Sequence, residues 1–252
     1  LLIKPFVEKL TRSELFTVMT GGFATVAGGV LAAYVGMLHG VFPDIGGHML
    51  AASIMSAPAP FAMAKIFEPE TEHPKTFGKL EIHLEKKAVN VIDAAAHGAS
   101  DGLKLALNVG AMLMAFVALL AMVNGILGGI WDGMTLGRIL GWGFAPVAWL
   151  IGVPWSDAMQ VGQLLGVKIT LTEFLAYSQL AEVADQISRK GMVVATYALC
   201  GFANLGSIAI QLGGIGALVP ERRQDLARLG FRAMFAGAMA SAMTAAIAGW
   251  LA

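Results

Sequence analysis

Long apolar runs, separated by short polar segments, make up most of the chain. The runs cover approximately residues 13–38, 47–67, 103–130, 136–175, 191–218 and 231–252. Most of them approach the roughly 20 apolar residues that an α-helix needs to cross a bilayer. The pattern therefore predicts an all-α, polytopic membrane protein.

The run at 191–218 has a centre that is unusual for a membrane helix, Cys200-Gly201-Phe202-Ala203-Asn204-Leu205-Gly206-Ser207. Glycine is a poor helix former, and Asn and Ser compete for backbone hydrogen bonds. Irregular backbone at membrane depth is tolerated only where it is buried in protein or lines a cavity. The stretch predicts a discontinuous helix whose break faces a polar site. Taken alone, it fits a seam of small residues between packed helices equally well.

A second interrupted run supports the discontinuous helix. Residues 13–38 contain Gly21, Gly22, Thr25, Gly28 and Gly29 near their middle. The predicted topology makes the two broken spans run in opposite directions. Paired broken helices in inverted halves are the sequence signature of a transporter site near the middle of the membrane.

Residues 136–175 divide into two apolar pieces, 136–151 and 156–174, on either side of Gly152-Val153-Pro154. Each piece is short for a span, so the pattern predicts a re-entrant helical hairpin. The alternative, two ordinary short spans, would place Asp157 and Lys168 against lipid, which is costly.

The remaining segments complete the predicted topology. The span at 47–67 should kink at Pro58 and Pro60, because each proline removes a helix hydrogen bond. Residues 68–87 form a polar loop, and the amphipathic stretch that follows predicts a helix at the membrane surface. The alternative is that this stretch forms the first turns of the next span. Further polar loops are predicted at 178–190 and 220–228.

Lysine and arginine are distributed unequally between the two sets of loops. Most lie in the set that includes 68–103 and 219–230, and the opposite set holds only Arg138, Arg189 and Lys190. Because cytoplasmic loops carry the excess of basic residues, the first set is predicted to be cytoplasmic. The chain then divides into three regions, 1–67, 68–130 and 131–252, and the last contains the hairpin, a broken helix and the final span.

Composition agrees with this interpretation. Of 252 residues, 57% are hydrophobic and 13% charged, against about 25% charged in soluble domains. The zero net charge gives no indication of nucleic-acid binding, and the single Cys200 excludes an intrachain disulfide. No nucleotide-binding P-loop is present, so transport would depend on an ion gradient or run downhill. The first residue is Leu1 rather than Met, and we expect the N-terminal part of a longer protein to precede it.

Four residues form the candidate binding site. Glu173 lies at the end of the second hairpin arm, and an ionisable residue at membrane depth indicates function. The alternative is an interfacial carboxylate that is solvated or paired with Lys168. Asn204 and Ser207 would share a helix face if the backbone there is helical. With Glu173 they could bind a sugar-like polyol by hydrogen bonds, and Phe202 would offer an apolar surface.

Motifs in the second half of the chain resemble those of the concentrative nucleoside transporter family, in the same order. They are Gly152-Val153-Pro154, Val161-Gly162, Gly166, Lys168, Glu173-Phe174, Gly201-Phe202-Ala203-Asn204, Ser207-Ile208, Pro220 and Arg222-Arg223. The opening Leu1-Leu2-Ile3-Lys4-Pro5 resembles the stretch just after that family's first hairpin. The resemblance covers essentially the whole chain and corresponds to the C-terminal part of the protein.

The resemblance implies a homotrimer in the plasma membrane, the inner membrane in a bacterium. Its protomers would carry nucleosides inward with a co-transported H⁺ or Na⁺, by an elevator-like movement. It implies no enzyme activity, no resident cofactor and no nucleic-acid partner. Carried over by position, Glu173 matches the glutamate that binds ribose, Asn204 and Ser207 match the ribose-contacting pair, and Phe202 matches the aromatic residue beside the sugar.

The chain also departs from the family's pattern. The Gln-Thr-Glu-type motif that reads the nucleobase would lie upstream of Leu1, so the choice between purine and pyrimidine stays open. Sodium-coupled members often have Asn and Ser where this chain has Thr172 and Gly29. This difference favours proton over sodium coupling, with the ion expected near Thr25, Gly28 and Gly29.

Three other functions remain as alternatives. A symporter for another small polar solute would use the same broken helices. An intramembrane enzyme could use Glu173 as an acid or base, but the sequence offers no second positioned catalytic group. A purely structural membrane scaffold would leave the two broken helices and the hairpin without explanation.

Overall fold

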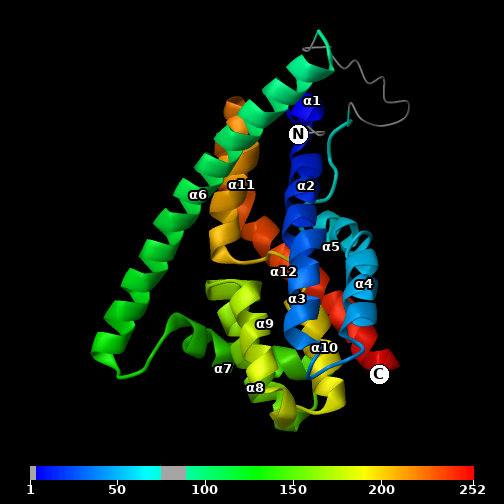
Figure 1. Ribbon diagram of the computed structural model, residues 1–252, viewed down its shortest axis with the longest axis vertical. Coiled ribbons are helices and arrows are strands. Elements are labelled where there is room, and N and C mark those ends of the chain that lie inside the picture. The colour runs from blue at the N-terminus through cyan, green and yellow to red at the C-terminus, as the bar shows by residue number, and fades with distance from the viewer. Residues whose placement is uncertain (1–3, 75–88) are drawn as a thin grey trace.

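The computed structural model describes residues 4–74 and 89–252, and these residues form helices joined by short turns, with no strand among them (Figure 1). The α-helices are Lys4–Val7 (α1), Arg12–Ala24 (α2), Gly28–Leu38 (α3), Ile45–Met55 (α4), Ala59–Phe67 (α5), Val91–Ile130 (α6), Leu136–Leu150 (α7), Trp155–Thr170 (α8), Glu173–Glu182 (α9), Arg189–Leu199 (α10), Leu205–Leu218 (α11) and Arg223–Leu251 (α12). Short 3₁₀ turns cover Ala184–Gln186 and Pro220–Arg222.

Both predicted broken helices are present. The first consists of α2 and α3, separated by residues 25–27, and the second of α10 and α11, separated by residues 200–204. The first half of each broken helix has a local reason to begin where it does. Thr11 and Glu14 form a capping box at the start of α2, and the Ser188 hydroxyl caps α10.

The two broken helices run in opposite directions and cross at their breaks. At one end of the pair, the Arg222 guanidinium donates to the Leu10 carbonyl. At the other end, Arg189 forms an ion pair with Asp44 at 3.0 Å. The arrangement matches the inverted pair that the sequence predicts, and it places the irregular backbone of both helices in the interior of the fold.

Helix α12 packs against α2, α5, α10 and α11. Its small residues allow this close packing, since a Cβ on Gly237 would lie 2.5 Å from the Cβ of Phe23. The prediction of a polar loop over 220–228 was wrong for residues 223–228, because α12 begins at Arg223. The charged residues there occupy the first turns of a helix that continues into the span.

The α4–α5 pair is bent by 43°, which confirms the kink predicted at the prolines.

Helix α6, in contrast, is continuous over 40 residues. The predicted surface helix and the following span therefore form one element, as in the alternative described above. Part of helix α6 packs along α11, and the C-terminal end of α6 extends away from the remaining helices (Figure 1). The polar loop expected at 68–87 lies mostly outside the described residues.

By length and composition, the described residues contain two segments able to cross a membrane, Arg12–Leu38 and Pro220–Leu251, and the bent α4–α5 pair provides a third. The protein is an all-α, polytopic membrane protein. A shorter apolar helix, Leu205–Leu218, follows the second break, and the end of α6 has the same character.

Helices α7 and α8 form the predicted hairpin about the turn at Gly152, where φ is +105°. Glycines on both helices bring the backbones close together, and a Cβ on Gly162 would lie 2.6 Å from the Ala145 nitrogen. The chain then reverses a second time, which the sequence did not predict. Thr172 caps α9, which runs back along α8 and places Gln186 in hydrogen-bond contact with Gln160.

Candidate functional site

The Glu173 carboxylate is held by one donor from each broken helix. Glu173 is the first residue of α9 and only 4% exposed. Its Oε1 accepts a hydrogen bond from the Tyr34 hydroxyl of α3 at 3.0 Å. Its Oε2 accepts one from the Asn204 amide at the second break, also at 3.0 Å. The carboxylate therefore joins the turn between α8 and α9 to both broken helices.

Asn204 has two roles at the second break. Its Oδ1 accepts the backbone N–H of Ser207 at 2.8 Å and so caps α11. Its Nδ2 donates to Glu173. The condition under which Asn204 and Ser207 would share a helix face is not met, because Asn204 precedes the helix and has extended backbone dihedrals. The structure nevertheless brings the two residues together in a buried position.

The backbone between α10 and α11 is fixed on both sides. Gly201 has φ of +111°, a conformation that side chains disfavour. The Cys200 carbonyl, which ends α10, accepts the Ser241 hydroxyl of α12 at 2.7 Å. Phe202, the predicted aromatic neighbour of the sugar, is half-buried in this same break.

Tyr34, which contacts Glu173, packs against Tyr177, and the sequence analysis missed both tyrosines. Their rings stack at a centroid distance of 4.3 Å. The Tyr177 hydroxyl donates to the Thr196 carbonyl of α10 at 2.6 Å. In an apolar run, a tyrosine is ordinarily interpreted as a residue that packs in the core. Only its hydroxyl, which usually finds a hydrogen-bond partner when buried, could have indicated a role in the site.

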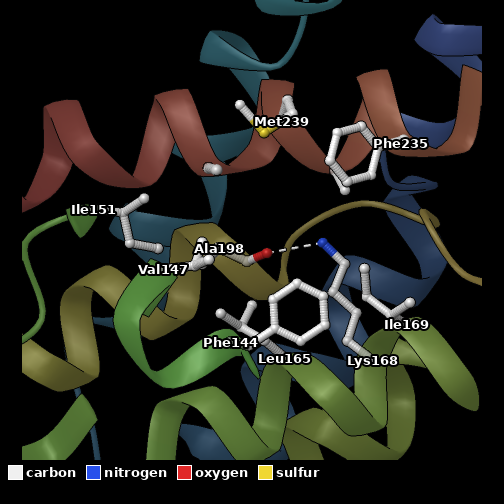
Figure 2. Close-up of a pocket in the computed structure, with 11 residues that line it drawn as sticks. Phe144, Val147, Ile151, Leu165, Lys168, Ile169, Ala198, Phe235 and Met239 are labelled. Carbon is white, nitrogen blue, oxygen red and sulfur yellow. Dashed lines mark hydrogen bonds between the residues drawn. The ribbon is translucent and has the colours of Figure 1, made fainter. Parts of the chain in front are cut away.

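Lys168 is buried at the end of α8, and its Nζ donates to the Ala198 carbonyl near the end of α10 at 2.8 Å (Figure 2). Apolar side chains from α7 and α12 surround the ammonium, among them Phe144, Phe235 and Met239. Because the carboxylate oxygens of Glu173 are engaged by Tyr34 and Asn204, the alternative of a Glu173–Lys168 surface pair does not describe this site.

The three residues expected near the ion lie at the first break. The Thr25 hydroxyl donates to the Gly21 carbonyl at 2.9 Å, so it is engaged within its own helix. Gly28 and Gly29 open α3 and have free space around them. None of the three is among the described residues that hydrogen-bond to Glu173.

Two histidines and an aspartate, His39, Asp44 and His48, lie at the turn between α3 and α4 or in the first turn of α4. Asp44 is engaged by Arg189, and the His48 ring stacks on Phe42. Within residues 4–74 and 89–252, no group of three His, Cys, Asp or Glu side chains is arranged to bind a metal ion.

The sequences at the two breaks are related. Gly22-Phe23-Ala24-Thr25 ends α2, and Gly201-Phe202-Ala203-Asn204 follows α10. Three of the four residues are identical, and they stand at the crossing of two antiparallel broken helices. The first stretch is helical as far as Ala24 and the second is the break itself, so the similarity marks the place where the two helices meet.

The Glu173 carboxylate makes the site an acceptor of hydrogen bonds. An ionised carboxylate offers about four lone-pair positions, and protein donors occupy two of those on Glu173. The remaining positions suit a ligand with neighbouring hydroxyl donors. Discontinuous helices place their ends beside the carboxylate, as in transporters whose site lies at a helix break.

Comparison with known families gives a consistent result. A family model described as the C-terminus of the Na⁺ dependent nucleoside transporters matches residues 48–249. The chain is 51% identical to the uncharacterized transporter YutK of Bacillus subtilis, over 99% of this chain and 62% of that protein. It is 43% identical to the nucleoside permease NupC of Helicobacter pylori, over 99% of this chain and 60% of that protein.

More distant relatives and solved structures extend the likeness. Human solute carrier family 28 member 3 is 40% identical over all of this chain and 39% of its own length. A doubly substituted CNTnw in an outward-facing state superposes with a TM-score of 0.86 and 47% identity, covering 99% of this chain and 60% of that one. CNTnw in an inward-facing, substrate-bound state gives a TM-score of 0.79 at 47% identity, covering 98% of this chain and 59% of that one. The chain thus spans about three fifths of the length of its bacterial relatives.

Proposed function

The chain belongs to the family of Na⁺ dependent nucleoside transporters, and on this premise we propose that the protein carrying it is a nucleoside:cation symporter. It imports nucleosides across the plasma membrane and performs no reaction on them. The relative from Helicobacter pylori is named as a nucleoside permease, and a rat relative as a sodium/nucleoside cotransporter.

The observation that carries this proposal is the position of Glu173 between two broken helices. Among the described residues, only Tyr34 and Asn204 donate hydrogen bonds to this carboxylate. Its remaining lone pairs can therefore accept hydrogen bonds from two ribose hydroxyls. Asn204 and Ser207 complete the sugar contacts, and Phe202 packs beside the ribose. A symporter for another small polyol is the second candidate, because the same carboxylate accepts any paired hydroxyls.

We further propose that the coupled cation is a proton. Hard cations are bound by several oxygen ligands, and the side chains at the first break and at the turn between α8 and α9 supply few such oxygens. Gly29 has no side chain, the Thr25 hydroxyl is engaged by Gly21, and the Thr172 hydroxyl caps α9. The relatives' sodium dependence makes sodium the alternative outcome.

We propose that the intact protein is a homotrimer in the lipid bilayer, oriented with the loops at 68–103 and 219–230 in the cytoplasm. The excess of basic residues in these loops supports the orientation. The proposal of a trimer is based on the resemblance to the family.

Uptake by the intact protein in proteoliposomes tests the proposal. Labelled uridine is supplied with an inward proton gradient in one arm and a sodium gradient in the other, and uptake is expected with the proton gradient. Glu173→Gln and Asn204→Ala are each expected to raise the KM for uridine about tenfold or more, the effect of losing a hydrogen bond to a charged group. Glu182→Gln, the same change at the exposed other end of α9, is the control.

Three results separate the alternatives. Uptake driven only by sodium would reverse the choice of cation and leave the nucleoside proposal intact. No uridine uptake in either arm by folded protein, with uptake of another polyol, would select the second candidate. Unchanged uridine affinity in both Glu173→Gln and Asn204→Ala would remove the proposed sugar site.

A further inference from the structure

We propose that Tyr34 is a positioning residue that sets how strongly the transporter selects for the ribose hydroxyls. The inference rests on the proposed function, and it assigns the role to a side chain outside the expected site. Tyr34 acts through Glu173 and need not contact the nucleoside itself.

Tyr34 is the one described residue of the first broken helix that hydrogen-bonds to the Glu173 carboxylate. It comes from α3, is completely buried, and donates to Oε1 at 3.0 Å. The other oxygen, Oε2, is held by Asn204 of the second broken helix. The two donors thus define the plane of the carboxylate and the directions in which its remaining lone pairs point.

The position of the Tyr34 hydroxyl is itself fixed by packing. Its ring stacks on Tyr177 with an interplanar angle of 27°, and the Phe174 ring lies 6.3 Å away in a tilted orientation. Both tyrosine side chains are completely buried, so this stack is enclosed on all sides. The Tyr34 donor is therefore preorganised before any ligand arrives, which reduces the cost of ordering the carboxylate on binding.

Loss of the Tyr34 hydroxyl would leave Asn204 as the single donor to the carboxylate within the described part of the chain. The terminal torsion of a glutamate side chain is broad, and one hydrogen bond does not confine it. The carboxylate could then turn away from the sugar. Recognition of the ribose hydroxyls would weaken, whereas contacts with other parts of the nucleoside would persist.

The structure offers a matched control for this prediction. Tyr34→Phe and Tyr177→Phe each remove one buried hydroxyl from the same stacked pair, and both keep the rings in contact. Only the first removes a donor to Glu173. A general loss of stability would affect both variants, whereas a loss of hydroxyl selection would affect only Tyr34→Phe.

The experiment compares uridine with 3′-deoxyuridine and 2′-deoxyuridine in proteoliposomes containing the intact protein. For each variant, the ratio of Vmax/KM for uridine to that for each deoxynucleoside is measured. In Tyr34→Phe we expect one or both ratios to fall about three- to tenfold, the effect of one hydrogen bond. Tyr177→Phe is expected to leave the ratios unchanged. Tyr34→Met, which also lacks the hydroxyl, repeats the test with different packing.

The Glu173→Gln protein distinguishes failure of the inference from failure of the proposed function. If Glu173→Gln abolishes the selection but Tyr34→Phe and Tyr34→Met retain it, Tyr34 has no positioning role. An equal fall in Tyr177→Phe also overturns the inference, because it would show a general packing effect. If Glu173→Gln itself leaves the ratios unchanged, the sugar site is wrong and the role of Tyr34 is rejected with it.

Discussion

The carbonyl oxygen of Ala24 lies 2.8 Å from the position that a Cβ atom on Gly201 would occupy. Ala24 ends the first half of one broken helix, and Gly201 lies within the break of the other. The two breaks therefore touch through backbone atoms. This contact requires a residue without a side chain, and it holds the irregular segments beside Glu173 in a fixed relation.

Gly201→Ala is expected to destabilise the protein. The alanine would be strained by φ of +111° and would also clash with backbone atoms, which cannot give way as a flexible side chain can. Backbone strain of this kind costs about 1–3 kcal/mol. Thermal melting of purified protein should show a lower Tm, and uridine uptake should fall.

Gly21→Ala provides the control for that substitution. Gly21 lies inside α2, and a Cβ added to it would meet no atom within 4 Å, so alanine fits there. An equal or higher Tm is expected, because alanine favours a helix by about 1 kcal/mol over glycine. A Gly201→Ala protein as stable as the Gly21→Ala protein would show that the two breaks are not in tight contact.

Local chemistry explains which parts of the fold could be predicted from the sequence. The two breaks, the proline kink and the turn at Gly152 all depend on residues that disfavour helix at that point. The reversal at Thr172 was missed because apolar residues continue on both sides of it, and its cap is one hydroxyl that accepts the Leu175 N–H. The start of α12 was missed because its first turns carry charges, which suggested a loop.

The candidate site was predicted only in part, for a different reason. Glu173 and Asn204 were found because polar groups are conspicuous in apolar runs. The partners that hold them depend on tertiary contacts, and Tyr34 is 139 positions away from Glu173 in the chain. No local pattern distinguishes such a tyrosine from one that packs in the core. The same is true of Lys168, whose partner is a backbone carbonyl.

Glu70 gives the protein a pH-dependent contact on the loop after α5. Burial raises the pKa of this carboxyl, but hydrogen bonds from the Thr11 hydroxyl and the Glu72 amide, with the charge of Lys65, outweigh burial and hold the pKa below its ordinary value of 4.5. The contribution to stability is therefore present above pH 4.5 and is lost as the pH falls through the lower pKa of the folded state. Tm measured from pH 7 to pH 3 should fall less steeply for Glu70→Gln than for the parent. If Tm depended on pH equally in both proteins, the ionised form of Glu70 would not stabilise the fold.

Ser241 couples the last span to the second break. Its hydroxyl is the donor to the Cys200 carbonyl at the end of α10, where the helix provides no further N–H. Ser241→Ala would leave this buried carbonyl unsatisfied, which costs about 1–3 kcal/mol. For a protein of this size, each kcal/mol corresponds to about 2–4 °C in Tm. We expect a lower Tm and, because the break would be less well fixed beside Glu173, a higher KM for uridine.

Thr244→Val is the matched control for Ser241→Ala, since it also removes one buried hydroxyl from α12. The Thr244 hydroxyl donates to the Ser241 carbonyl within the same helix, so its loss leaves the break untouched. Its Tm should change little and its KM for uridine should stay at the parental value. Equal increases in KM for both variants would indicate that α12 influences binding through its general stability. An increase confined to Ser241→Ala would establish that the hydrogen bond to Cys200 holds the break in its binding geometry.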